Sequence, residues 1–368
     1  MANTLITPSV VAREALMALE NNLVMANLVY RDYSNEFAKV GDTVSARRPA
    51  TFQANEFTTS ISVQDAVEGY VAVTLDKHLD VSFAVTSKEL TLSLNDFSEQ
   101  FIQPAMRAIA QKIDALILER YVDIPSFVIK SSPNVSTADI ANVGALLDSQ
   151  KAPLDSRVIV MSPFTYAKYI VLDAFLHADK SGSTDALRNA SMGKVLNLEG
   201  YMDQNVVSHS NGTFAVTSGT LTVASASVGD TSITASATAC SGTLKKGSLL
   251  TIADTPGQYV VTADCTAASN SITIPIYPAL QASVTSKAVT IVSNHYANLA
   301  FHKNAFAFVT RPLAFPLGAA NAEVINYNGL AVRAVYDYDI NAKKDIISLD
   351  ILCGVKTLDP NLAVRLVD

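Results

Sequence analysis

Cysteine is scarce in this sequence, with only Cys240, Cys265 and Cys353 among 368 residues. An odd number of cysteines without a C-x-x-C pair excludes a disulfide framework and a cysteine-based zinc site. The first residues also lack the basic segment and long apolar core of a secretory signal. We therefore expect the protein in a reducing compartment, with Cys240 and Cys265 reduced and Cys353 buried.

Charged residues and long apolar runs are scarce too. Charged side chains make up 17% of the chain, and the formal net charge is −7. Soluble domains usually contain about a quarter charged residues. The basic pairs Arg47-Arg48, Lys245-Lys246 and Lys343-Lys344 do not extend into a basic stripe, which argues against tight nucleic-acid binding. No apolar run reaches the ~18 residues of a membrane helix, and the 49% hydrophobic content excludes intrinsic disorder.

Motifs for catalysis and cofactors are missing. The sequence contains neither G-x-S-x-G nor H-E-x-x-H. Residues 242–247 begin like a phosphate loop, but Ser248-Leu249 follows where Lys-Ser/Thr is required. Residues 337–341 begin like a calcium loop, but Ala342 and Ser348 replace the required Gly and Glu. We therefore predict a protein that is not an enzyme and uses no cofactor or metal.

Five histidines are scattered along the chain: His78, His177, His209, His295 and His302. His295 and His302 are seven residues apart and could share one face of a helix. Two such residues still fall short of a zinc ligand set. Each histidine is therefore expected to be a partly exposed or a core residue.

Serine and threonine are abundant in one segment, residues 208–293, which holds 29 of them in 86 positions and only six charged residues. Short alternating runs recur between turn residues: Thr220–Val223, Thr231–Thr234, Leu249–Ile252, Tyr259–Thr262, Ser271–Ile276 and Ala288–Val292. Short strands at such spacing predict a small antiparallel barrel or sandwich. Because helical and strand patterns flank the segment, we interpret it as an inserted β-domain.

The N-terminal part mixes helical and strand patterns. Residues 8–29 have Pro8 at their start and a helical apolar stripe. Residues 69–86 alternate between apolar and polar side chains, which indicates one long strand or two strands that meet at a bend. The polar segment before them completes a possible arm, residues 43–86. Because this arm has no evident cover in its own chain, we expect it to lie on a neighbouring subunit.

The most regular helical pattern covers residues 95–122, with Asn95 or Asp96 as cap and Pro104 as a break or a second start. Its apolar stripe is Met106, Ile109, Ala110, Ile113, Leu116 and Ile117, whereas Arg107, Gln111, Lys112, Asp114 and Glu119 are expected elsewhere around the helix. Further helices are predicted at 137–149, capped by Ser136 or Thr137, and at 163–172, capped by Ser162. Residues 157–161 are expected to form a strand.

Four groups of segments carry a family resemblance. They are Val29–Tyr33 with Val40–Val44 and Arg48-Pro49; Asp96–Ala105 with Ile113-Asp114; Gly193–Tyr201 and Asn298–Phe306; and Tyr336–Asp339 with Ile351–Lys356 and Leu358–Pro360. In this order they resemble the major capsid proteins of tailed bacteriophages with the HK97-like fold. The resemblance is closest to the P22-type coat proteins, which carry an inserted β-domain.

The resemblance implies an α+β, HK97-like fold with an added small all-β domain. The implied parts are an N-terminal arm (1–42), an extended loop and long strand (43–86), a peripheral domain with a spine helix (87–136), an axial domain (137–207 and 294–335), the inserted β-domain (208–293) and closing peripheral strands (336–368).

The implied function is that of a major capsid protein. Copies would assemble as hexamers and pentamers into an icosahedral shell around double-stranded DNA, with scaffolding protein and portal as partners and only non-specific DNA contact. Assembly in the host cytoplasm and a place in the virion capsid are implied, without a membrane. Candidate inter-subunit contacts are Arg47, Arg48, Lys77, Lys245 and Lys246.

Two alternatives remain open at this point. One is a β-rich binding module or adhesin, which would need an aromatic-lined face, and residues 208–293 offer only Phe214, Tyr259 and Tyr277. The other is the shell protein of a cellular nanocompartment.

Overall fold

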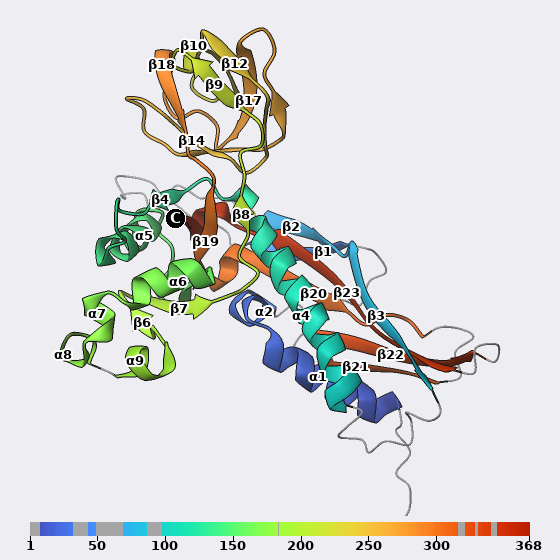
Figure 1. Ribbon diagram of the computed structural model, residues 1–368. Helices are drawn as coiled ribbons and strands as arrows, with labels where there is room; N and C mark the ends of the chain where they lie inside the picture. Colours follow the sequence, from blue (N-terminus) through green and yellow to red (C-terminus); the bar gives the residue numbers. More distant parts are fainter. Residues whose placement is uncertain are drawn as a thin grey trace, which may run out of the picture. The chain divides into compact units, whose positions relative to one another are not determined.

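The computed structural model describes residues 8–31, 43–48, 69–86, 98–182, 184–315, 321–327, 330–339 and 344–368 (Figure 1). The chain forms two compact units. The first contains Met1–Asp114 and Phe306–Leu358, and the second contains Ala115–Ala305 and Asp359–Asp368. Both combine helices with strands, which confirms the α+β class. The finer domain boundaries expected from the sequence remain predictions.

Four helical segments begin in the first unit: α1 (Pro8–Asn22), α2 (Met25–Leu28), the π-helical turn η2 (Ser98–Ile102) and α4 (Gln103–Leu118). The helix expected over 8–29 is interrupted between α1 and α2. Pro104 lies in the first turn of α4, where its missing N–H costs no hydrogen bond. The proposed caps Asn95 and Asp96 lie outside the described residues.

Asp114 explains the interruption between α1 and α2. Its carboxylate accepts hydrogen bonds from the backbone N–H groups of Val24 at 2.9 Å and Ala26 at 3.2 Å. These N–H groups start a new helix and have no partner within it. Asp114 is buried, so the sequence-based placement of this residue away from the buried stripe is wrong. The apolar residues Ile109 and Ile113 are buried as predicted.

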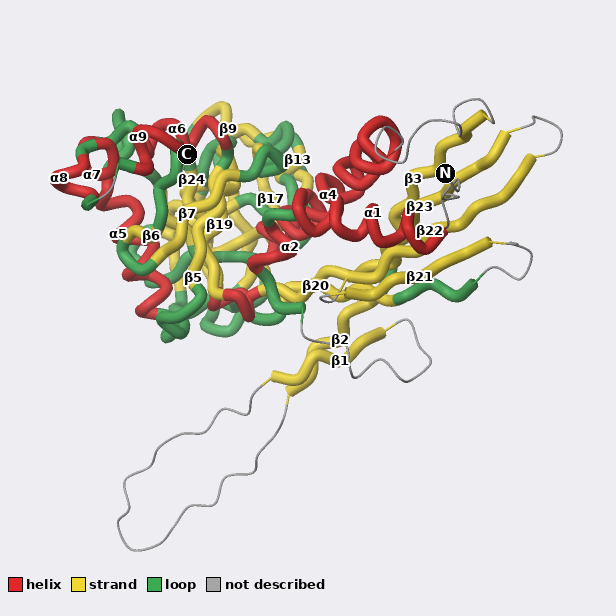
Figure 2. The backbone as a smooth tube through the Cα atoms, turned by 90° about the horizontal axis from the view of Figure 1, so that it is seen from below, coloured by secondary structure: helices red, strands yellow, loops and turns green. Residues whose placement is uncertain are grey.

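The sheet of the first unit has the order β20-β23-β22-β21, with β3 also paired to β23. Its strands are antiparallel: β3 (Lys77–Thr86), β20 (Phe306–Arg311), β21 (Asn321–Tyr327), β22 (Leu330–Asp339) and β23 (Lys344–Thr357). Helices α1 and α4 lie on one face of this sheet (Figures 1 and 2), and α1 packs on β21 and β22.

Residues 69–86 form two strands, the second of the two arrangements that the alternation allowed. β2 (Gly69–Thr74) pairs with β1 (Thr43–Arg48), and β3 follows after Leu75 and Asp76. β3 pairs with β23 over its whole length, and Val73 and Leu75 are buried with Ala307 and Val309. The expectation that this strand lacks cover in its own chain is therefore wrong. Val73 belongs to β2, so the β1–β2 ribbon is also covered at this residue, although its two strands pair only with each other among the described strands.

A buried ion pair joins three strands of this sheet. Asp350 on β23 accepts two hydrogen bonds from the guanidinium of Arg333 on β22, and its Oδ2 lies 3.2 Å from Nε2 of His78 on β3. Asp350 is almost fully buried, so its charge needs these partners. These side-chain contacts join β23 to β22 and to β3, in addition to the backbone hydrogen bonds between the strands.

The main sheet of the second unit has the order β4-β24-β19-β5-β7-β6, and β8 pairs with β19. Its strands are β4 (Phe127–Ile129), β5 (Arg157–Met161), β6 (Lys194–Val195), β7 (Leu198–Met202), β8 (Ser208–His209), β19 (His295–His302) and β24 (Ala363–Val367). The expected strand at 157–161 is thus confirmed. His295 and His302 are the two ends of one strand, so the suggestion that they share a helix face is wrong.

Helices cover one face of this sheet, with Ile140, Val143 and Tyr169 among the residues packed on it. The helices that contribute to this packing are α5 (Thr137–Ser149), α6 (Pro163–Ile170), α7 (Asp173–Leu176) and α9 (Asp185–Asn189). The described residues of α8 (Ala178–Ser181) are exposed, and a 3-10 turn, η3 (Glu119–Asp123), follows α4. Ser136 caps α5 in a capping box with Asp139, and Ser162 caps α6, which confirms both predicted starts.

The Ser/Thr-rich segment forms a closed barrel, as predicted, with the strand order β10-β11-β17-β15-β14-β18. Its strands are β10 (Thr222–Ala226), β11 (Ser232–Ser236), β14 (Leu249–Ile252), β15 (Tyr259–Val261), β17 (Ser271–Tyr277) and β18 (Val284–Ile291). Each of the six alternating runs overlaps one of them. Alternate residues such as Ile233, Ile272 and Ile274 fill a hydrophobic core of its own.

Short strand pairs and turns complete the structure. Beside the barrel, β9 (Ala215–Ser218) pairs with β12 (Ala239–Ser241), and β13 (Thr243–Leu244) pairs with β16 (Cys265–Thr266). The 3-10 turns are η4 (Lys303–Ala305) and η5 (Pro360–Leu362).

Candidate functional site

The β1–β2 ribbon carries two of the predicted contact residues. Arg47 pairs with Tyr70 and Arg48 with Gly69 in the antiparallel ladder. Both arginines lie at the end of the ribbon that continues into residues 49–68, which are outside the described part. Two arginines supply positive charge to this end of the ribbon.

The three predicted lysines each have an acidic partner in their own unit. Lys77 pairs with Asp76 at 2.9 Å, Lys245 with Asp264 at 2.7 Å, and Lys246 with Asp123 at 3.7 Å. Lys245 and Lys246 share the carboxylate of Asp264, because the backbone N–H of Lys246 also donates to it. These side chains are about half exposed, so their ion pairs contribute little to stability.

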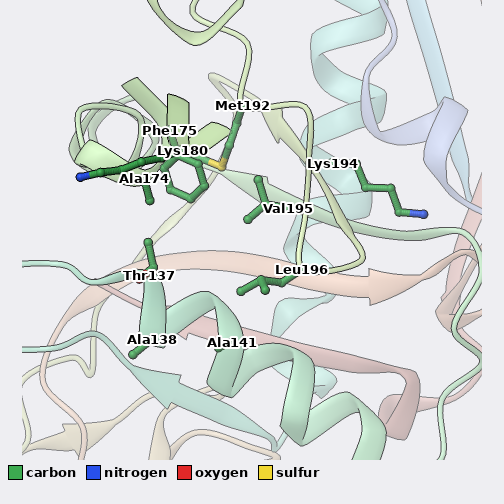
Figure 3. A pocket seen from close by; sticks show the side chains of 10 residues that line it. All are labelled: Thr137, Ala138, Ala141, Ala174, Phe175, Lys180, Met192, Lys194, Val195 and Leu196. Atoms are coloured by element: carbon green, nitrogen blue, oxygen red, sulfur yellow. The ribbon is translucent and has the colours of Figure 1, made fainter. Parts of the chain in front are cut away.

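A hollow of about 480 Å³ lies between α5, α7 and β6 (Figure 3). Its lining is mainly apolar, with Ala138, Phe175 and Met192 as typical members. The side-chain nitrogens of Lys180 and Lys194 point away from the other lining residues (Figure 3). The described residues that line it include no histidine, cysteine or carboxylate.

The barrel meets the face of the main sheet opposite to α5 and α6. Leu249, Val260 and Val292 of the barrel pack against Phe127 and Val367 of the sheet. The side-chain amide of Gln258 extends this contact, because it donates to the carbonyl of Phe127 and accepts from its N–H, both at 2.7 Å. Gln258 thereby satisfies the backbone of edge strand β4.

A polar cluster lies in the same interface, and we call Tyr121, His209, Ser248, His295 and Arg365 the junction cluster. Nδ1 of His209 lies 2.9 Å from the Tyr121 hydroxyl, and its Nε2 lies 3.1 Å from the Ser248 hydroxyl. The Ser248 hydroxyl donates to the carbonyl of Lys245 at 2.8 Å. The centroids of the His295 and His209 rings are 5.3 Å apart. All but Tyr121 are at least 95% buried.

Arg365 is the charged member of the junction cluster and is completely buried. Its guanidinium donates to the carbonyls of Ile124 at 2.9 Å and Gly247 at 2.8 Å and lies over the Tyr121 ring. Within the described part of the chain, no carboxylate pairs directly with it. A buried cation held only by carbonyls and an aromatic ring makes further positive charge at this place unfavourable.

The titration of the cluster follows from this environment. Burial, reinforced by the charge of Arg365, lowers the pKa of His209 to about 4. Burial also lowers the pKa of His295 and raises the pKa of the Tyr121 hydroxyl. All three groups are therefore neutral at pH 7.

Only the positions of two histidines in the sequence are related to the junction cluster. His209 and His295 lie at the two ends of the Ser/Thr-rich segment, and they become neighbours because β8 and β19 pair with each other. Read singly, neither histidine indicates a cluster. Tyr121 and Arg365 are far away in sequence and carry no such sign.

Burial raises the pKa of two of the cysteine thiols. Burial raises the pKa of Cys353 to about 12 and that of Cys265 to about 11. The prediction that Cys353 is buried is confirmed. Neither residue is an activated nucleophile, because the reactive thiolate is disfavoured at neutral pH.

Among the described residues, no three His, Cys, Asp or Glu side chains are grouped so as to hold a metal ion. No described helix is both long and apolar enough to span a membrane.

Comparison with known proteins gives one family match. The family model described as P22 coat protein, gene protein 5, matches residues 1–274. No curated protein matches the sequence.

Several solved structures are similar to this one. That of Mycobacterium phage Che8 has a TM-score of 0.51 and 16% identity, and the match covers 94% of this chain and 90% of the other. The capsid of cyanophage P-SCSP1u has a TM-score of 0.47 and 11% identity, and the match covers 89% of this chain and 84% of the other. The capsid of Ralstonia phage GP4 has a TM-score of 0.46 and 11% identity, and the match covers 92% of this chain and 87% of the other. The first likeness supports a shared fold.

Proposed function

The chain belongs to the P22 coat protein family and is thus a structural protein of a viral capsid, and from this premise we propose how it works. Copies assemble as hexamers and pentamers into an icosahedral shell that encloses the double-stranded DNA of a tailed phage. The observation that carries the proposal is the family match over residues 1–274 together with the fold shared with the phage Che8 structure.

The β1–β2 ribbon supports a role in assembly. It pairs only with itself among the described strands, and isolated two-stranded ribbons are marginally stable in water. Contact with a neighbouring subunit would stabilise it. We therefore propose that Arg47 and Arg48 contact that neighbour, with the paired residues Lys77, Lys245 and Lys246 as secondary contacts.

The partners of the shell are also part of the proposal. A scaffolding protein and a portal act during assembly in the host cytoplasm. The packaged DNA is touched only non-specifically, since a net charge of −7 disfavours tight phosphate binding.

The adhesin alternative receives no support from the barrel. Of its candidate aromatic residues, Tyr259 is fully buried and Phe214 packs against the barrel core. Tyr277 alone is exposed, which is too little for an aromatic-lined binding face.

Electron microscopy of the purified protein in negative stain tests the proposal. We expect shells or capsomers. Replacing residues 50–67 by a short Gly/Ser linker should leave the thermal melting unchanged and abolish assembly, because β1 and β2 still pair. The double variant Arg47→Ala with Arg48→Ala should also assemble poorly. Its control is Lys287→Ala, which removes an exposed ion pair with Asp254 on the barrel. A monodisperse monomer from the parent, or normal shells from the linker variant, would contradict the proposal.

A further inference from the structure

The junction cluster lies where the barrel is attached to the main sheet. Tyr121 and Arg365 belong to the sheet side, Ser248 belongs to the barrel, and His209 and His295 belong to the two strands that connect them. We infer that the cluster makes this attachment sensitive to protons: protonation of His209 breaks the hydrogen-bond chain from Tyr121 to Ser248 and separates the barrel base from the sheet.

The hydrogen-bond chain requires a neutral His209. The Lys245 carbonyl can only accept, so the Ser248 hydroxyl donates to it and must accept from Nε2–H of His209. Nδ1 of His209 then carries no proton and accepts from the Tyr121 hydroxyl. A proton added to Nδ1 takes away this acceptor, which leaves the buried Tyr121 hydroxyl hydrogen without a partner.

His295 is neutral for a similar reason. Its Nδ1 donates to the Ser293 carbonyl at 2.7 Å, so the neutral ring leaves Nε2 without a proton. A second proton on this ring would introduce a charge 5.3 Å from the His209 ring and close to the guanidinium of Arg365. The two histidines and Arg365 therefore disfavour one another as cations.

The charged groups around the cluster do not compensate a new proton. On η3, Asp123 acts on Arg365 and is already paired with Lys246, while Glu119 is exposed. On the barrel side, Lys245 and Lys246 add positive charge and share Asp264. The side chain of Asn211 favours the protonated ring of His209 through a hydrogen bond, but it carries no charge. A protonated His209 would therefore lie close to the buried cation of Arg365, with no direct carboxylate partner among the described residues.

The pH range follows from the two states of the junction. In the opened state His209 has an ordinary pKa near 6.5, whereas in the closed state its pKa is about 4. The closed state binds fewer protons. The free energy by which His209 favours the closed state is therefore fully present above pH 6.5 and is lost as pH falls towards 4. Between pH 7 and pH 4.5 the opening equilibrium should shift on the order of 100-fold.

Hydrogen–deuterium exchange of the full-length unassembled chain measures this opening. The informative amide is that of Phe127 on β4, which donates to Oε1 of Gln258 on the barrel and so loses its acceptor when the barrel separates from the sheet. After correction for the intrinsic rate, we expect its protection to fall on the order of 100-fold from pH 7 to pH 4.5. Peptides from β22 in the other unit should show no comparable change.

Two glutamine variants distinguish the cluster from general acid effects. His209→Gln keeps a donor and an acceptor but cannot titrate, so protection at Phe127 should become insensitive to pH. His177→Gln changes an exposed histidine and should keep the parental response. The inference is overturned if His209→Gln responds to pH like the parent, or if parental protection does not change with pH. Should His209→Gln not fold, NMR titration of His209 in the parent decides, and an ordinary pKa near 6.5 overturns the inference.

Discussion

Asp114 shows how one side chain divides a helix. The apolar pattern of residues 8–29 would allow a single helix, but the Asp114 carboxylate binds the N–H groups of Val24 and Ala26, and a new helix starts there. A carboxylate at a helix N-terminus also interacts favourably with the helix dipole. The residue that shapes the N-terminal segment is thus supplied by the spine helix about 90 positions later.

We predict that Asp114→Ala lowers the free energy of unfolding by about 1–3 kcal/mol, because two N–H groups lose their acceptor in a buried place. Asp114→Asn should cost less, since its amide oxygen still accepts one of these bonds. Gln111→Ala, on the exposed side of the same helix, is the control. Urea unfolding of the three variants measures the effect. Unfolding of Asp114→Ala at the parental midpoint would show that the contact does not stabilise the protein.

Residue types with strong local preferences were predictable from the sequence. The caps Ser136 and Ser162 and the start of α6 at Pro163 follow from short-range chemistry, and the structure confirms them. Asp114 and the junction cluster were not predictable, because their partners come from distant parts of the chain. A buried polar residue is recognised only when its partners are known.

At the level of elements, the spine helix α4 has one buried and one exposed side. Its buried side carries Ile109 and Ile113, and its exposed side carries Arg107 and Lys112. The 3.6-residue stripe that predicts this orientation is regular enough to hold in the structure.

We expect Ile113→Asp to prevent folding, because an unpaired charge in the core costs several kcal/mol and total stability is only about 5–15 kcal/mol. Lys112→Ala should melt like the parent and, where its side chain faces a neighbour, alter assembly alone. Soluble yield and thermal melting of both variants are the measurements. Parental melting of Ile113→Asp combined with insolubility of Lys112→Ala would mean that the helix is rotated from this orientation.

Strand alternation predicted the barrel better than the arm. Each of the six runs in 208–293 became a barrel strand, since alternation together with turn residues specifies which face is buried. The same alternation in 69–86 allowed either one long strand or two strands that meet at a bend, and it did not reveal the pairing of β3 with β23. Pairing with a strand some 270 residues away is a tertiary property that the local pattern does not contain.

At the level of the whole molecule, the barrel has the features of an independent folding unit. It is closed, so it has no free sheet edges, and its own apolar core includes Leu250, Ile252 and Val261. Its contact with the main sheet involves a few apolar side chains, the two hydrogen bonds between Gln258 and Phe127, and the junction cluster.

Residues 208–293 expressed alone should therefore fold. We expect a dispersed amide spectrum by NMR and a cooperative thermal transition. Within this fragment, Leu250→Ala should cost about 2–5 kcal/mol by leaving a cavity in the barrel core. An exposed substitution, Lys287→Ala, serves as the control. A spectrum with random-coil shifts would show that the barrel depends on the rest of the chain.

The pairing of β8 with β19 has an evolutionary consequence. The chain leaves the main sheet at His209 and returns at His295, and these two residues are partners in one ladder. Because entry and exit are adjacent, the intervening 85 residues can be replaced by any module with neighbouring termini, without a change of register in the sheet below. A single recombination event at this point would suffice to give a lineage a new domain, and the same position is the natural one for displaying a foreign domain.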